Sequence, residues 1–258
     1  MANLLAENVA IITGASSGIG RATALVLAER GLRLALLARS RNELTQVAEQ
    51  AKQLGARDAG CFVCDVSNEQ RVEGAVAATL ERFGQIDILI NSAGLSLNGE
   101  VDGYPLDDWC TVIETNLTGT FLTCRAVLPT MKRQRSGQII NISSGAGRNG
   151  IKQMAAYCAS KFGVIGFTES LGHEVRAHNI RVSALLPGSV ATDFSRVAKR
   201  QDHSSDQSAT DIGYSMTAAE VASVIVGMLE QPAQAWMSEV ILRPLNLELK
   251  RTSNESSR

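Results

Sequence analysis

Two residues of this sequence are well suited to proton transfer, Tyr157 and Lys161, which lie four positions apart in the stretch YCASK. If that stretch is helical, both side chains lie on one face of the helix. A lysine ammonium beside a phenol favours the phenolate and lowers the pKa of the tyrosine, which can then exchange a proton with a substrate oxygen. Because this spacing is common on helix surfaces, the pair indicates acid–base chemistry only where further functional groups accompany it.

Two hydroxyl groups accompany the pair, those of Ser143 and Ser144, at the end of the apolar run that precedes Tyr157. Ligands of open parallel sheets bind beyond the carboxyl ends of the strands. If the run is a strand of such a sheet, these hydroxyls lie at the ligand site. The sequence therefore predicts a site that combines a serine, a tyrosine and a lysine.

A glycine cluster near the N-terminus, Thr13 to Gly20 (TGASSGIG), joins a strand-like run to a helical segment that begins near Gly18. The N-terminus of that helix carries unpaired N–H groups and a partial positive charge, which attract a pyrophosphate. A structural turn is the alternative, but a turn needs fewer glycines than Gly14, Gly18 and Gly20. The position after the first strand favours a dinucleotide site.

The end of the next strand indicates which dinucleotide binds. A site for NAD places Asp or Glu roughly 20 residues after the glycines, whereas this sequence has Arg39, Ser40 and Arg41 there. A guanidinium binds a phosphate through paired, charge-assisted hydrogen bonds, so Arg39, helped by Ser40 and Arg41, predicts NADP(H). The alternative is that these arginines only solvate the start of a helix.

Short apolar runs alternate with longer segments in which apolar residues recur every three or four positions. The runs expected to be strands are Val9–Thr13, Arg33–Ala38, Cys61–Val66, Ile86–Asn91, Gln138–Ser143, Arg181–Leu186 and Val240–Leu242. Clear helical segments are Ile19–Arg30, Asn42–Leu54 and Glu69–Phe83. Strands that are apolar throughout suit a sheet covered on both faces. The sequence predicts an α/β fold: a single-domain Rossmann fold over residues 1–258, with a doubly wound parallel seven-stranded sheet and helices on both faces.

Local signals support these boundaries. Ser40 and Ser67 stand where a side-chain oxygen can cap the start of a helix, and Gly31 and Gly55 follow the ends of two helices.

Two polar stretches stand apart from this alternation. The segment 199–215 interrupts the pattern after the sixth strand, at a place where a substrate lid could lie. The polar tail 250–258 is expected to be frayed.

Composition excludes several classes of protein. With 25 Lys and Arg against 26 Asp and Glu, no long-range positive field is available to hold a nucleic acid. The apolar runs are far shorter than a bilayer span, and the first residues lack the pattern of a signal peptide. We therefore expect a cytoplasmic protein that binds neither nucleic acid nor membrane.

The cysteines and histidines do not predict a metal site. The 5 cysteines are an odd number, which indicates reduced thiols. Cys61 and Cys64 match the C-x-x-C pattern, but in a strand they point to opposite faces. None of the three histidines, His173, His178 and His203, has a zinc-type spacing to a cysteine pair.

With these motifs in place, the sequence resembles the short-chain dehydrogenase/reductase family, in its compact single-domain branch, over nearly the whole chain. TGASSGIG matches the glycine motif T-G-x-x-x-G-x-G, and YCASK matches Y-x-x-x-K. NSAG at Asn91 to Gly94 matches N-N-A-G, with Ser92 in place of the second asparagine. Asn116 in NLTG, Ser144, and PGSVAT from Pro187 to Thr192 also fall at the family's positions and in its order.

The resemblance implies roles for the site residues. Tyr157 is the general acid for carbonyl reduction and the base for alcohol oxidation, Lys161 lowers its pKa and binds the nicotinamide ribose, and Ser144 orients the substrate oxygen. Asn116 holds a water that links Lys161 to solvent. The cofactor-binding residues that it implies, together with those argued above, are Gly14, Ser16, Ser17, Gly18, Ile19, Gly20, Arg39, Ser40, Arg41, Asp65, Val66, Asn91, Ala93, Gly94, Tyr157, Lys161, Pro187, Gly188, Val190 and Thr192.

The leading hypothesis is an NADP-dependent oxidoreductase that reduces a small-molecule carbonyl to an alcohol or catalyses the reverse. A 3-oxoacyl-carrier-protein reductase is a narrower hypothesis. The basic run Met131 to Arg135 could meet an acidic carrier protein, which favours it. The C-terminal stretch SEVILRPLNLELK lacks the paired glycines of those enzymes, which weakens it. Two further hypotheses are a non-catalytic NADP(H)-sensing protein and a sugar epimerase. The apolar helices with Trp109 to Met131 and Phe162 to Val175 suggest a homo-oligomer, a dimer or tetramer.

Overall fold

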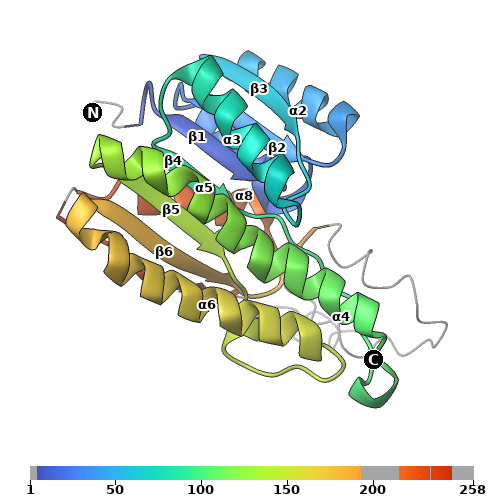
Figure 1. Cartoon of the computed structure of the whole chain (residues 1–258). Coiled ribbons are helices and arrows are strands. Elements are labelled where there is room, and N and C mark those ends of the chain that lie inside the picture. Colours follow the sequence, from blue (N-terminus) through green and yellow to red (C-terminus); the bar gives the residue numbers. More distant parts are fainter. Residues whose placement is uncertain (1–4, 193–214, 233, 246–258) are drawn as a thin grey trace, which may run out of the picture.

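Seven parallel strands form the central sheet of the computed structural model, which describes residues 5–192, 215–232 and 234–245 (Figure 1). The strand order is β3-β2-β1-β4-β5-β6-β9, and each neighbouring pair is parallel. The strands are β1 (Val9–Thr13), β2 (Arg33–Ala38), β3 (Asp58–Val63), β4 (Ile88–Asn91), β5 (Gly137–Ile142), β6 (Ile180–Pro187) and β9 (Glu239–Leu242). The order reverses between β1 and β4, so the fold places a ligand at the carboxyl ends of these two strands.

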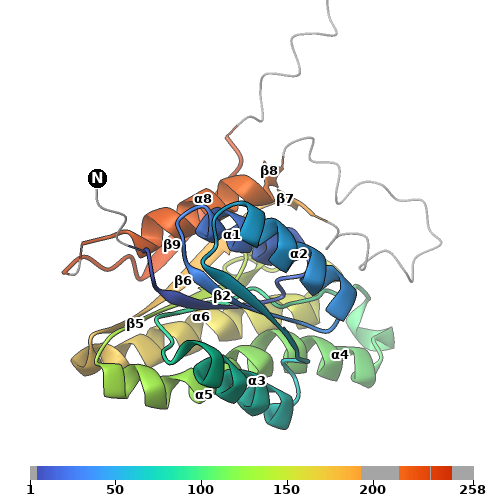
Figure 2. The same cartoon turned by 90° about the horizontal axis from the view of Figure 1, so that it is seen from above.

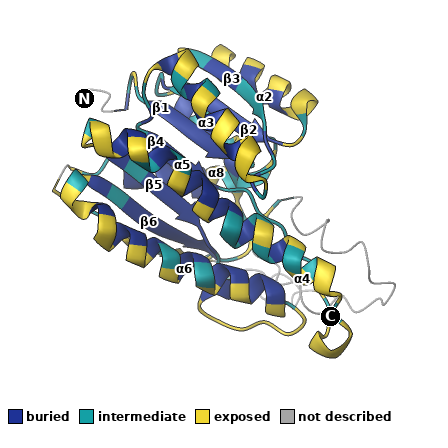
Figure 3. Cartoon of the chain, viewed as in Figure 1, coloured by how far each residue is buried: buried dark blue, intermediate teal, exposed yellow. Residues whose placement is uncertain are grey.

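Helices cover both faces of this sheet (Figure 2). One layer holds α1 (Gly18–Ala28), α2 (Arg41–Gln53) and α8 (Ala218–Leu229); the other holds α3 (Glu69–Phe83), α5 (Gly119–Gln134) and α6 (Ala155–Val175). Helix α4 (Leu106–Ile113) continues into α5 through a π-helical turn, Glu114–Thr118. Between the two layers the five inner strands are almost entirely buried, whereas the edge strands β3 and β9 are mostly half-buried (Figure 3). The predicted doubly wound Rossmann fold is therefore confirmed.

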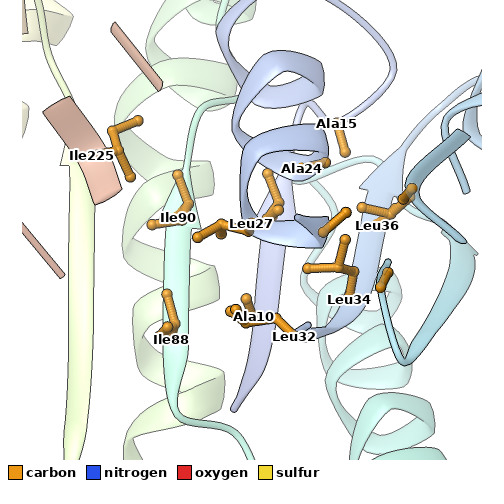
Figure 4. Packing of buried hydrophobic residues seen from close by; sticks show 14 of the residues in the cluster. Ala10, Ala15, Ala24, Leu27, Leu32, Leu34, Leu36, Ile88, Ile90 and Ile225 are labelled. Atoms are coloured by element: carbon orange, nitrogen blue, oxygen red, sulfur yellow. The ribbon is translucent and has the colours of Figure 1, made fainter. Parts of the chain in front are cut away.

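Strand β1 shows why the strands lack an alternation of apolar and polar residues. Successive side chains of a strand point to opposite faces. Ala10 and Ile12 pack into the cluster under α1, α2 and α8, whereas Val9 and Ile11 pack into the cluster under α3, α5 and α6. Figure 4 shows the first cluster, in which Leu27 of α1 lies over the strands. Each fully buried leucine or isoleucine contributes about 1.5–3 kcal/mol relative to an exposed one.

The largest error in the predicted boundaries concerns β3, which was expected at Cys61–Val66 and lies at Asp58–Val63. This strand is at the edge of the sheet, where one face is less covered and a polar residue is tolerated. Its first residue, Asp58, pairs with Arg82 at 2.8 Å. The search for apolar runs missed the polar start of the strand and included three residues that follow its end.

One of the two predicted helix caps is wrong. The N-cap of α3 is Asn68, whose side chain accepts a hydrogen bond from the Arg71 amide, whereas Ser67 donates its hydroxyl to Asp65 at 2.7 Å. Ser40 does occupy the N-cap position of α2, although its side chain makes no capping bond.

The two glycines that were expected to follow the ends of helices, Gly31 and Gly55, lie just after α1 and α2. Both have positive φ angles, of 72° and 113°, which favour glycine over other residues.

The predicted lid falls outside the described residues except for its last residue, Ser215, and so does the predicted tail 250–258. Two short parallel strands flank the gap, β7 (Val190–Ala191) and β8 (Met216–Thr217). Within the residues that the structure describes, no helix is both long enough and apolar enough to cross a membrane. The assignment of residues 1–258 to one domain stays a prediction.

Candidate active site

A cleft of about 410 Å³ opens at the carboxyl ends of the strands. Its lining consists of Gly14, Ser16, Ser17, Gly18, Ile19, Leu37, Ala38, Arg39, Ser40, Glu43, Cys64, Asp65, Val66, Ser92, Ala93, Gly94, Leu95, Thr115, Ile142, Ser143, Ser144, Tyr157, Lys161, Pro187, Gly188, Val190 and Thr192. Four of the predicted site residues lie outside this lining, namely Gly20, Arg41, Asn91 and Asn116. The others meet in one cleft, although they come from distant parts of the chain.

The glycine-rich turn forms one end of the cleft with its backbone. Gly14 has a φ of +64°, and a Cβ there would lie 2.9 Å from the backbone of Ala93. A Cβ on Gly20 would lie 2.4 Å from the Gly14 carbonyl oxygen, so Gly20 closes the turn and does not line the cleft. The hydroxyl oxygen of Thr13 accepts hydrogen bonds from the Ser92 and Ala93 amides at 3.0 and 3.1 Å. The close packing leaves the start of α1 facing the cleft, an arrangement that fits a pyrophosphate.

Charged side chains gather where β2 ends. Arg39 is exposed and lines the cleft beside Ser40, Glu43 and Asp65. Burial raises the pKa of the Asp65 carboxyl, but hydrogen bonds from Ser67 and the attraction of Arg39 and Arg71 outweigh it, so the net shift is downward. Asp65 therefore stays ionised near neutral pH. The Arg39 guanidinium fits a phosphate monoester at this place.

The tyrosine lies on the first turn of α6, with only 8% of Tyr157 exposed. Its hydroxyl lies near the Ser144 side chain, whose oxygen accepts a hydrogen bond from the Ala146 amide at 3.1 Å. Burial raises the pKa of Tyr157 to about 12, and the nearby Ser144 side chain offsets only part of that rise. The expectation of a lowered tyrosine pKa is therefore wrong for this structure, because desolvation of the phenolate dominates.

Lys161 is also buried, with 5% exposed, and its Nζ lies 5.6 Å from the centre of the Tyr157 ring. The ammonium donates to the Ile142 carbonyl oxygen at 2.8 Å. Burial lowers the pKa of Lys161 to about 8, so the side chain is still mostly protonated at neutral pH. An ammonium has three N–H donors, and two remain for groups in the cleft.

Asn116 lies outside the lining of the cleft and links the elements that surround it. Its side chain accepts from the Leu95 amide at 2.8 Å and donates to the Leu95 carbonyl at 2.9 Å and to the Ser160 hydroxyl at 3.0 Å. Asn116 belongs to the π-helical turn, an irregularity that is frequent at functional sites. A Cβ on Gly94 would lie 3.2 Å from the Asn116 carbonyl-type oxygen Oδ1 and 3.6 Å from the Lys161 Nζ. The asparagine thus holds the loop after β4 close to the lysine.

The sequence prediction missed eight lining residues: Leu37, Ala38, Glu43, Cys64, Ser92, Leu95, Thr115 and Ile142. Most of them are sequence neighbours of predicted residues at the ends of strands. A wider selection around each strand end would therefore have included them. Ser143 stands beside Ser144 in the sequence, but its bond could not be predicted: its hydroxyl donates to the Lys161 carbonyl at 2.9 Å.

Other charged and polar groups near the cleft or singled out in the sequence lie elsewhere or are already paired. Arg148 forms an ion pair with Glu239. The basic run Met131 to Arg135 lies at the end of α5, next to the amino end of β5, whereas Ser144 follows the carboxyl end of that strand. Among the residues that the structure describes, no three His, Cys, Asp or Glu side chains form a group that could hold a metal, and all five cysteines are free thiols.

Fold and cleft together define a dinucleotide-binding α/β protein. Residues 8–203 match the family model described as short chain dehydrogenase. The chain belongs to the short-chain dehydrogenase/reductase family, whose fold binds a nicotinamide cofactor, and it is an oxidoreductase of that family.

Several relatives and solved structures are similar to this chain over nearly their full length. An uncharacterized oxidoreductase of Staphylococcus saprophyticus is 35% identical over 93% of this chain and 99% of its own. A levodione reductase structure has a TM-score of 0.86 at 30% identity, covering 92% of this chain and 96% of that one. An NAD+-bound xylitol dehydrogenase has a TM-score of 0.84 at 32% identity (93% and 98%), and a Thermococcus sibiricus alcohol dehydrogenase complexed with 5-hydroxy-NADP has 0.82 at 28% (93% and 97%).

Proposed function

We propose that this protein is an NADP-dependent oxidoreductase that reduces a small-molecule carbonyl to an alcohol, or catalyses the reverse. The observation that carries the proposal is that the buried Tyr157 lines one cleft together with Ser144 and Lys161. A neutral phenol is a proton donor, and its raised pKa keeps it protonated at neutral pH. When bound, the reduced nicotinamide supplies the hydride that such a reduction requires.

The chain itself supplies position and proton. The Ser144 hydroxyl orients the carbonyl oxygen toward Tyr157, which donates its proton as the oxygen becomes an alkoxide. The Lys161 ammonium then stabilises the phenolate that this transfer leaves behind, and its free N–H donors hold the cofactor ribose. Asn116 keeps the loop with Gly94 and Leu95 against Lys161 through its three side-chain hydrogen bonds. The opposite direction uses the phenolate as the base.

The preference for NADP rests on Arg39. Its guanidinium lines the cleft where a 2′-phosphate is expected, and Ser40 offers a further hydroxyl donor. No Asp or Glu lies at the end of β2. The acidic residues that line this part of the cleft are Glu43 of α2 and Asp65, which follows β3. The related structures include both NADP-complexed and NAD+-bound proteins, so the family alone does not decide between the two cofactors.

Two further aspects belong to the same proposal. We infer a homo-oligomer, dimer or tetramer, because large apolar side chains are exposed on α4, α5 and α6: Trp109 (38%), Phe121 (41%) and Phe162 (47%). We also infer a cytoplasmic protein, because all five cysteines are free thiols, which suits a reducing compartment.

The test compares the wild type with Tyr157→Phe, using NADPH and NADH separately with ketones, 3-oxoacyl thioesters, quinones and sugars. We expect the wild type to oxidise NADPH faster than NADH on at least one carbonyl class. Loss of the general acid should lower kcat by about 10²- to 10⁴-fold, while NADPH still binds in a fluorescence titration. The matched control is Tyr104→Phe, because the Tyr104 hydroxyl donates to the Leu97 carbonyl at 2.7 Å and bonds to no other group among the residues that the structure describes.

Each competing hypothesis has its own outcome in this test. NADPH binding without turnover of any carbonyl would favour a cofactor-sensing protein over an enzyme. Turnover confined to 3-oxoacyl thioesters would narrow the proposal to the carrier-protein reductases. Faster oxidation of NADH than of NADPH would refute the role given to Arg39.

A further inference from the structure

Four polar side chains form a hydrogen-bonded chain through the apolar core beneath the cleft. The Thr123 hydroxyl of α5 donates to the Asn91 Oδ1 of β4 at 2.7 Å, and the Asn91 Nδ2 donates to the Asn141 Oδ1 of β5 at 2.9 Å. The Asn141 Nδ2 donates to the Thr168 hydroxyl oxygen of α6 at 2.9 Å, and that hydroxyl donates to the Val164 carbonyl. The four side chains are at most 4% exposed. The chain of donors therefore runs in one direction from α5 across two strands to α6.

Stability alone does not account for these groups in the core. A buried hydrogen bond contributes little net stability, and well-packed apolar side chains could fill the same space without needing partners. What polar groups add is direction, because a hydrogen bond weakens steeply when its geometry changes. A network that is fully satisfied fixes the elements that it joins in one arrangement.

The last link of the network joins the two elements that carry the acid–base groups. Thr168 lies seven residues after Lys161, two turns further along the same face of α6. At Lys161 itself, the Nζ bonds to the Ile142 carbonyl and the backbone carbonyl accepts from the Ser143 hydroxyl. Helix α6 is thus bonded to the β5 segment at two points, one inside the cleft and one in the core.

Directional contacts limit how far α6 can shift along β5. The other buried residues on this face of the helix, such as Val164, Ile165 and Leu171, are apolar, and apolar contact has no preferred direction. Helices shift by 1–2 Å in known conformational changes. A shift of that size would separate the Tyr157 hydroxyl from Ser144, and a misplacement of 1 Å can cost a factor of about 100 in rate.

We propose that Asn141 and Thr168 are positioning residues that hold α6 in register with β5, so that Tyr157 stays next to Ser144 in the cleft. Neither residue lines the cleft. Of the bonds between the β5 segment and α6, the one at Lys161 Nζ involves a group that also serves the cofactor, and the one from Ser143 begins at a residue that lines the cleft. The bond between Asn141 and Thr168 lies away from the cleft. The expected effect on turnover rests on the proposed function, but the effect on geometry does not.

The first arm of the test measures kinetics of Thr168→Val, which keeps the shape of the side chain but leaves the Asn141 Nδ2 without its acceptor. We expect kcat to fall about 10- to 100-fold, with the KM for NADPH within about threefold of the wild type. Thr168→Ser, which keeps the hydroxyl, should retain kcat within about threefold. The matched control is Thr79→Val, because Thr79 is an equally buried helical threonine whose hydroxyl donates to the Ala75 carbonyl of its own helix.

The second arm measures geometry in crystal structures of the wild type and the same variants. In Thr168→Val the distance between the Ser144 and Tyr157 hydroxyl oxygens should be longer than in the wild type, while in Thr79→Val it should not change. If valine prevents folding, Thr168→Ala makes the same prediction. A Thr168 variant with wild-type distance and wild-type kcat would overturn the inference. Wild-type protein that turns over no carbonyl would refute the proposed function, and the measured distances would still decide the positioning role.

Discussion

Lys161 combines a buried charge with a place beside the predicted acid, and these two properties affect stability and activity in opposite ways. Burial lowers the pKa of its ammonium from 10.5 to about 8. Because the folded-state pKa lies below the unfolded one, the unfolded chain binds more protons between these values, and the free energy of unfolding rises with pH from about 8 to about 10.5. Below pH 8 this contribution is absent, and above 10.5 it reaches roughly 3 kcal/mol.

We therefore expect Lys161→Met to remove this pH-dependent rise and to be more stable than the wild type at pH 7, because an apolar side chain replaces a buried charge. Carbonyl reduction should be lost. Urea unfolding at pH 7 and pH 9.5 measures the difference. Lys52→Met, which changes a half-exposed lysine that pairs with Asp58, should keep the rise of the wild type. An equal rise in Lys161→Met would show that the lysine is not desolvated as described.

At the scale of single residues, the sequence predicted which side chains form the site, but not how deeply they are buried or which hydrogen bonds they make. Tyr157, Lys161 and Ser144 could be chosen because their identities and spacing suit the chemistry. The direction of the tyrosine pKa could not, because it depends on how completely the packed helix and sheet exclude water. The hydrogen bonds of Asn116 to Leu95 were equally out of reach, since they join residues 21 positions apart.

At the scale of elements, the first strand, turn and helix depend on glycines for two different physical reasons, positive φ and close backbone contact. Gly14→Ala should destabilise the fold and weaken NADPH binding, because a Cβ would lie 2.9 Å from the Ala93 backbone at a φ of +64°. The left-handed conformation alone costs roughly 1–2 kcal/mol. Urea unfolding and a fluorescence titration with NADPH measure the two effects.

A second glycine makes the opposite prediction and serves as the control. Gly74 lies inside α3, and a Cβ there meets nothing within 4 Å. Gly74→Ala should therefore stabilise the protein by about 0.5–1 kcal/mol and leave NADPH binding unchanged. Equal effects of the two substitutions would contradict the distinction drawn between the turn and the helix.

Periodicity predicted which elements exist, but not always where they begin. Helix α3 was predicted with its observed bounds because its apolar residues repeat regularly and strand-like runs flank it. Strand β3 was misplaced because Asp58 is stabilised by a distant partner, Arg82, which the local sequence does not reveal. The cap at Asn68 was missed for a related reason, since Ser67 is held by Asp65.

The whole molecule shows the same division between local and distant information. A parallel sheet with helices on both faces follows from apolar strands that alternate with helices. The order of the strands depends on contacts between elements far apart in the sequence, such as the pairing of β1 with β4. The cleft arises where that order reverses, so the site is a property of the complete fold.

Helices α4 and α5 follow each other end to end, and α6 lies beside them on the outside of the same layer (Figure 1). These helices expose Trp109, Phe121 and Phe162. The Phe121 ring of α5 meets the Phe167 ring of α6 edge to face at 6.1 Å, so aromatic side chains of these two helices are in contact. Exposed aromatic groups on neighbouring helices are typical of surfaces that bind another protein. A second copy is the expected partner, because most oligomers of soluble proteins are symmetric and contain one kind of chain.

In a two-fold interface each residue occurs twice, so a charge introduced near the axis repels its own copy as well as losing apolar contact. We therefore expect the wild type to sediment as a dimer or tetramer of the 27.5 kDa chain and Phe121→Glu/Phe162→Glu to shift toward the monomer. Analytical ultracentrifugation at micromolar concentration measures both. Leu54→Glu is the control, because Leu54 is equally exposed (44%) but caps α2 in the opposite layer, and it should keep the wild-type mass. A monomeric wild type would refute the oligomer, whereas an unaffected double variant would move the interface to another surface.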